Sequence, residues 1–133
     1  FLTRVIAEIG APDIIIDDGS HLSEHVVHSF HILFPLLAPH GIYVVEDLQT
    51  SYWGLESKIT GNWGGSSDLS APHTSMNFLK SLVDGLNYEE FPHDGYTPSY
   101  FDRNIVAIHF YHNLAFIQKG TNDEGSNILG KRF

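Results

Sequence analysis

The sequence predicts an α/β domain in which parallel strands are followed by an antiparallel hairpin. Two apolar runs, at 14–16 and 42–45, are typical of buried strands. A helical pattern joins them, and a strand, helix and strand over about thirty residues form a right-handed parallel unit. Two later apolar runs, at 104–110 and 114–119, are separated by a short Tyr-His-Asn segment, which predicts a hairpin.

Composition limits the possible partners. The length of 133 residues predicts one globular domain. The absence of cysteine excludes a disulfide framework and a thiolate metal site. Sixteen acidic residues outnumber seven Lys and Arg, and the net charge of −9 argues against binding to the phosphates of nucleic acid. No signal peptide or membrane-spanning segment is visible, so we expect a cytoplasmic protein without a membrane partner.

The first half of the chain predicts two helices around the first strand. Residues 1 to about 9 carry apolar side chains on one helical face, and Gly10 with Pro12 ends that helix. The crossover helix is expected over 22–37, with Ser20 as its N-cap.

The second half predicts a long loop before another helix. Residues 48–73 are rich in glycine and serine and contain two tryptophans, so they form either a lid or substrate loop or a tolerated insertion. Thr74 or Ser75 caps the next helix, whose predicted buried face holds Leu79, Leu82, Val83 and Leu86. A further loop contains Tyr96, Tyr100 and Phe101, and a polar tail follows the hairpin.

Acidic side chains follow both parallel strands. Asp17 and Asp18 end the first strand, Glu46 and Asp47 end the second, and His21 follows Asp18 by three residues. The ends of neighbouring parallel strands meet at one edge of a sheet, and carboxylates are costly to cluster without a cation. The pattern therefore favours a hard cation such as Mg²⁺, although solvated acids at a loop start and a helix-capping Asp17 remain alternatives.

Three segments carry a resemblance to a known family. Residues 17–21 (Asp-Asp-Gly-Ser-His), 41–53 and 113–120 resemble the metal-dependent, S-adenosylmethionine-using O-methyltransferases that modify deoxysugars of macrolide antibiotics. The resemblance implies the C-terminal half of a Rossmann-like class I methyltransferase fold, with a partial domain over 1–120 and a polar tail over 121–133. It also implies a natural-product enzyme that transfers a methyl group to the hydroxyl of a sugar or glycoside.

The same resemblance implies roles for four residues at the strand ends, in which Asp18, Glu46 and Asp47 would bind Mg²⁺ and His21 would take the proton of the acceptor hydroxyl. For Asp17, a contact with the cofactor is the alternative to capping the crossover helix. This allocation agrees with chemistry, because a Lewis acid lowers the pKa of an alcohol and histidine ionises near pH ~6.5.

The glycine-rich cofactor turn and the ribose-binding acid of class I methyltransferases are missing. Residues 61–65 are glycine-rich, but no strand precedes them. The chain is therefore expected to lack most of the cofactor site, and the strand over 13–17 is expected to have one unpaired edge. We expect either that a longer parent chain carries the activity or that two copies pair through this edge.

Two other functions compete with methyl transfer. The first is a catalytically inert half-domain that binds metal and forms oligomers. The second is a non-haem iron enzyme with ligands Asp18, His21 and either His109 or His112. Its usual antiparallel barrel does not fit the strand-helix-strand pattern.

Overall fold

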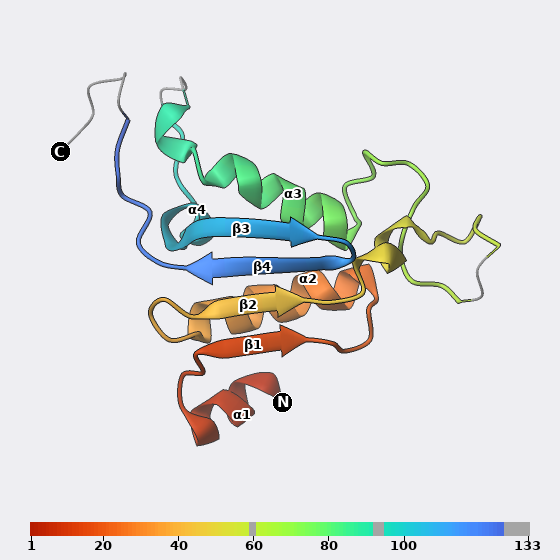
Figure 1. The fold of residues 1–133 in the computed structure, drawn as a ribbon, viewed down its shortest axis with the longest axis horizontal. Helices are drawn as coiled ribbons and strands as arrows, with labels where there is room; N and C mark the ends of the chain where they lie inside the picture. The colour runs from red at the N-terminus through yellow and green to blue at the C-terminus, as the bar shows by residue number, and fades with distance from the viewer. Residues whose placement is uncertain (59–60, 92–94, 127–133) are drawn as a thin grey trace.

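A computed structural model of the chain describes residues 1–58, 61–91 and 95–126. It contains one four-stranded sheet with helices on one side (Figure 1). No helix in the described ranges is long and apolar enough to cross a membrane. The elements in chain order are α1 (Leu2–Ile9), β1 (Ile14–Asp17), α2 (Ser23–Leu33), η1 (Phe34–Leu36), β2 (Ile42–Val45), η2 (Leu48–Tyr52), α3 (Ser75–Gly85), η3 (Tyr88–Glu90), α4 (Tyr100–Asn104), β3 (Ile105–Tyr111) and β4 (Leu114–Lys119).

The predicted parallel unit and the predicted hairpin are both confirmed. β1 and β2 are parallel, with Ile14 opposite Ile42 and Asp17 opposite Val45. β3 and β4 are antiparallel, and the sheet order is β1-β2-β4-β3. β4, the last strand in the described residues, therefore lies between β2 and β3, antiparallel to both.

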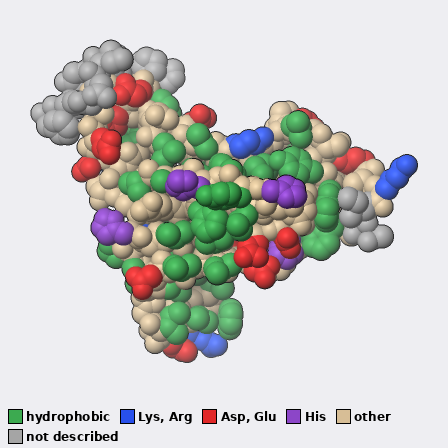
Figure 2. Space-filling view, in the orientation of Figure 1, with side chains coloured by type: hydrophobic (Ala, Val, Ile, Leu, Met, Phe, Trp, Pro, Cys, Tyr) green, Lys and Arg blue, Asp and Glu red, His purple; other side chains and the backbone are tan. Residues whose placement is uncertain are grey.

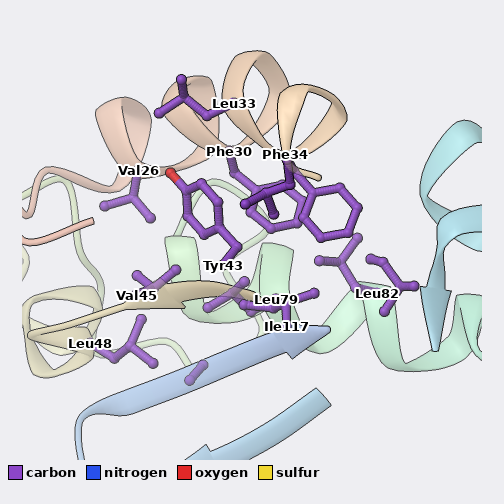
Figure 3. Close-up of a cluster of buried hydrophobic side chains, with 13 residues drawn as sticks. Val26, Phe30, Leu33, Phe34, Tyr43, Val45, Leu48, Leu79, Leu82 and Ile117 are labelled. Carbon is purple, nitrogen blue, oxygen red and sulfur yellow. The ribbon is translucent and has the colours of Figure 1, made fainter. Parts of the chain in front are cut away.

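The hydrophobic core lies between the sheet and the helices α2 and α3 (Figure 3). Phe30 on α2 is completely buried at its centre. Its ring stacks on Phe34 at 4.9 Å between centroids and meets Tyr43 of β2 edge-on at 5.0 Å. Phe78 of α3 and Phe101 of α4 lie within 5.4 Å of the same ring. One aromatic side chain thus joins three helices to the sheet.

Three details differ from the sequence predictions. The crossover helix starts at Ser23, its N-cap Leu22 makes no side-chain bond, and the hydroxyl of Ser20 instead pairs with Nδ1 of His25 at 2.7 Å. Val83 is 39% exposed and does not belong to the buried face of α3. The segment containing Tyr100 forms the short helix α4 where a loop was expected.

The other face of the sheet has no covering helix within the described ranges. Figure 2 shows hydrophobic side chains gathered on this face. Ile14 and Ile16 of β1 are each 59% exposed, and β1 is the edge strand, as the sequence predicted. A shallow hollow of about 510 Å³ lies on β2, β3 and β4 and is lined by Ile42, His109, Tyr111, Leu114, Phe116 and Gln118.

Candidate metal centre at the strand ends

Two loops lie side by side where β1 and β2 end. The backbone N–H of Glu46 donates to the carbonyl of Asp17 at 3.1 Å, so the parallel pairing continues one step beyond β2. The chain after β1 turns into α2 through residues 18–22, and the chain after β2 turns into η2 at Asp47. This arrangement brings side chains from both turns together at one edge of the sheet.

Asp18, His21 and Asp47 converge at this edge. One ligand atom from each residue lies within 4.8 Å of the others. Nε2 of His21 is 3.4 Å from Oδ2 of Asp47 and 3.8 Å from Oδ1 of Asp18. The two carboxylates are about half exposed or more, whereas the histidine side chain is only 19% exposed. The group therefore has an open acidic side and a more buried imidazole.

Both His21 and Asp47 have left-handed backbone conformations. Their φ angles are 56° and 53°, which L-amino acids other than glycine adopt rarely. Such conformations persist only where the surrounding structure fixes them, and they are common at functional sites. Gln49 adds a side-chain contact, because its Nε2 donates to Oδ1 of Asp47 at 2.9 Å.

Asp17 lies outside the converging group. Its carboxylate accepts a hydrogen bond from the hydroxyl of Tyr43 at 3.0 Å. Burial raises the pKa of Asp17, and the hydrogen bonds from Tyr43 and from the backbone of Gly19 partly oppose that shift. The alternative that Asp17 caps the crossover helix is wrong, because Leu22 is the N-cap of α2.

Glu46 and the two C-terminal histidines are not part of this group either. Among the described residues, the acids and histidines that converge closely enough to share an ion are Asp18, His21 and Asp47. Glu46 is half-buried and adjacent to Asp47 in the chain. His109 lies on the hollow of the uncovered sheet face, so the structure does not assemble the two-histidine set that the iron hypothesis requires.

The long loop reaches the site through Trp63. The carbonyl of Trp63 accepts from the backbone N–H of Ser23 at 3.1 Å, which ties the loop to the start of α2. Its ring centroid lies 6.5 Å from that of His21 and 6.4 Å from that of Trp53. The sequence predicted a long loop over 48–73, as either a lid or substrate loop or a tolerated insertion, but not which tryptophan lies near the histidine, because that depends on the tertiary path of the loop.

The donor set fits a hard cation bound by carboxylates. Mg²⁺ prefers oxygen ligands and keeps several waters, and the exposed oxygens of Asp18 and Asp47 suit that preference. Nitrogen is a poorer ligand for Mg²⁺, so His21 suits proton transfer better than coordination. Nδ1 of His21 is buried and has no hydrogen-bond partner in the part of the chain that the structure describes.

Parallel strands joined by a crossover helix, with an antiparallel strand inserted beside them, match the C-terminal part of the class I methyltransferase fold. No family model matches the chain. The chain is 52% identical over 126 residues to demethylmacrocin O-methyltransferase of Streptomyces fradiae. The matched segment covers 93% of the chain and 30% of that protein. It is 47% identical over 127 residues to mycinamicin VI 2''-O-methyltransferase of Micromonospora griseorubida, with 94% and 30% covered.

A solved structure shares the same fold. MycE methyltransferase from the mycinamycin biosynthetic pathway, in complex with Mg and SAH, superposes with a TM-score of 0.86 at 44% identity, covering 100% of this chain and 34% of that protein. The chain is therefore a homologue of the C-terminal part of the macrolide-sugar O-methyltransferases. It spans about a third of the length of these relatives.

Proposed function

We propose that this chain carries the metal and base half of an S-adenosylmethionine-dependent, Mg²⁺-assisted O-methyltransferase that acts on a sugar or glycoside hydroxyl. The observation that carries the proposal is the convergence of Asp18, His21 and Asp47 at the strand ends. The relatives support it, because a MycE structure contains Mg, SAH and mycinamycin VI. The substrate class and the cofactors are inferred from those relatives.

The three residues of the group divide into two proposed roles. Asp18 and Asp47 hold the cation through their exposed oxygens. Nε2 of His21 takes the proton of the acceptor hydroxyl, and the two nearby carboxylates stabilise the imidazolium that forms. Bound Mg²⁺ supplies positive charge that lowers the pKa of the hydroxyl. The acceptor oxygen then bonds to the methyl carbon as the carbon-sulfur bond of S-adenosylmethionine breaks.

Two further predicted contacts have weaker structural support. Glu46 remains a predicted carboxylate ligand because it directly precedes Asp47, although its side chain is outside the converging group. A contact between Asp17 and the cofactor also stays a prediction, since Tyr43 already binds one of its carboxylate oxygens.

A metal titration tests the ligand assignment. Calorimetric titration of the chain with Mg²⁺ should give saturable binding, and Asp47→Asn should weaken that binding by more than about tenfold. Mutation of a residue that only hydrogen-bonds to a metal ligand already lowers metal affinity about 10–100-fold, so loss of a ligand itself should cost at least as much. Asp84→Asn makes the same change on the exposed side of α3 and should leave the affinity unchanged. Equal affinity of the Asp47 variant and the unmodified chain would exclude Asp47 as a ligand.

A second variant separates the base from the ligands. In a longer parent protein that includes the cofactor site, His21→Ala should keep the Mg²⁺ affinity within about twofold yet lower methyl transfer at least about 100-fold, the usual contribution of a general base. Transfer from labelled S-adenosylmethionine to a macrolide deoxysugar glycoside is the measurement. Metal binding without saturable S-adenosylmethionine binding by that parent protein would favour the inert metal-binding half-domain.

A further inference from the structure

We propose that Thr50 is a positioning residue, whose single hydroxyl holds the proposed base His21 and the proposed ligand Asp47 at a fixed separation. The inference rests on the proposed function, because it concerns the geometry of that metal site. Thr50 itself touches neither the cation nor the acceptor in this scheme. It acts through the backbone of the two residues that do.

The hydroxyl of Thr50 bonds to both site residues. Oγ1 donates to the carbonyl of His21 at 2.8 Å and to the carbonyl of Asp47 at 3.0 Å. A threonine hydroxyl has one proton, so the two carbonyls share it in a three-centre hydrogen bond. The bond to His21 spans 29 residues of sequence and joins the loop after β1 to the helix after β2.

Both carbonyls belong to residues with positive φ. The left-handed backbones of His21 and Asp47 each cost energy relative to the ordinary regions, and contacts from the fold must offset that cost. A shared hydrogen bond to the two carbonyls supplies such a contact at both residues at once. Loss of the hydroxyl frees the two turns to relax independently, which moves Nε2 of His21 relative to the carboxylate of Asp47.

Thr50 is itself anchored by the fold. It is only 4% exposed, and its own N–H donates to the carbonyl of Asp47 at 3.2 Å. The next residue, Ser51, pairs with the hydroxyl of Ser75 at 2.6 Å and accepts from the N–H of Met76 at 3.1 Å. Buried hydrogen bonds therefore connect η2 to the first turn of α3. The position of the Thr50 hydroxyl is therefore fixed by this connection as well as by the N–H bond of Thr50 to Asp47.

Three variants of the chain test the inference. Thr50→Val removes the hydroxyl while keeping the shape of the side chain, and Thr50→Ser keeps the hydroxyl. Thr74→Val is the matched control, because Thr74 is equally buried at 3% exposure and its hydroxyl also bonds a backbone carbonyl, that of Ala71, at 3.3 Å. Thr74 also caps α3 through the N–H of Asn77, so the control lowers stability without touching His21 or Asp47.

The first measurement uses NMR on the metal-free chain. Positive φ brings the amide and α hydrogens of a residue close together, so His21 and Asp47 should show strong intraresidue cross-peaks between these two hydrogens. Thr50→Val should weaken both cross-peaks, while Thr50→Ser and Thr74→Val should keep them. Unchanged cross-peaks in Thr50→Val, or equal weakening in Thr74→Val, would overturn the inference.

The second measurement is Mn²⁺ affinity, followed by the paramagnetic signal of the free ion. Thr50→Val should bind Mn²⁺ at least about tenfold more weakly, whereas Thr50→Ser and Thr74→Val should stay within about threefold of the unmodified chain. Unchanged affinity in Thr50→Val would contradict the role. If the unmodified chain takes up no Mn²⁺, the proposed function fails, and the NMR comparison alone decides the role of Thr50.

Discussion

At the scale of single residues, Tyr43 connects the core to the edge that carries the site. Its ring is completely buried against Phe30, yet its hydroxyl donates to the carboxylate of Asp17 at the end of β1. Burial and the neighbouring charge of Asp17 raise the pKa of Tyr43, so the hydroxyl remains protonated and keeps donating. The core thereby fixes the residue that precedes Asp18.

Tyr43→Phe should give a pH-dependent loss of stability in metal-free buffer. Burial raises the pKa of Asp17 above its usual 3.8, so ionisation of Asp17 opposes folding as the pH rises through the folded-state pKa. The hydrogen bond from Tyr43 lowers the pKa of Asp17 because it favours the ionised carboxylate. Its removal should therefore lower the free energy of unfolding by about 2 kcal/mol at neutral pH, and by less at about pH 4, where Asp17 is more often protonated. Urea unfolding at both pH values measures the difference. Equal losses would show that the bond does not depend on the charge of Asp17.

The converging residues of the site could be predicted because they directly follow the strands. Asp18 and Asp47 come after two parallel strands whose ends must share an edge, and His21 follows in the same turn. The position of Glu46 could not be predicted, because adjacent residues point in different directions once the strand ends. Thr50 left no sequence signal, since its role depends on a contact between two loops.

At the scale of elements, α4 shows how a short helix escapes sequence analysis. Its five residues are too few to show a helical period, so a loop was expected there. The available signal was the pair Ser99 and Asp102, which forms a capping box with bonds of 3.1 Å and 2.7 Å. Longer elements such as α3, with apolar residues at regular spacing, were predicted correctly in position and type.

Ser99→Ala should destabilise the chain by about 1 kcal/mol, because it removes the N-cap of α4 and half of the capping box. The remaining Asp102 would still accept from Tyr96 at 2.7 Å, so the helix should loosen rather than disappear. Thermal or urea unfolding gives the free energy. Ser81→Ala on the exposed side of α3 is the control and should not lower the free energy of unfolding, since alanine has the highest helix propensity at interior positions of a helix. Equal stability of the two variants would contradict the cap.

At the scale of the whole molecule, the helices that the structure describes cover one side of the sheet. Fully apolar parallel strands are normally covered on both faces, and the sequence of β1 and β2 meets that description. Within the described ranges, helices pack on the face that holds Tyr43 and Ile117, whereas Ile14 and Ile16 face outward at an unpaired edge. An exposed apolar edge of this kind favours association with another chain.

The chain should therefore associate with increasing concentration, and Ile16→Lys should reduce this association. A lysine on an edge strand disfavours pairing, and residue 16 is 59% exposed, so the thermal midpoint should change little. Sedimentation velocity over a concentration series measures the effect. Val83→Lys places the same charge on exposed α3 and should not alter association. A single-chain mass at all concentrations, or an equal effect of both lysines, would contradict this account.

The position of β4 has a consequence for the order in which the molecule is built. β4 follows β2 by almost seventy residues, yet it is the strand that pairs with β2 on the side away from β1. The turn before β4 also holds the start of η2, because the N–H of Leu48 donates to the carbonyl of Asn113 at 3.1 Å. A ribosome releases the N-terminal strands first, and pairing across a long sequence separation is slow. The turns that carry Asp18 and Asp47 are therefore translated before β4 but are held in place only after β4 pairs with β2, so Asp18, His21 and Asp47 converge only when β4 joins the sheet.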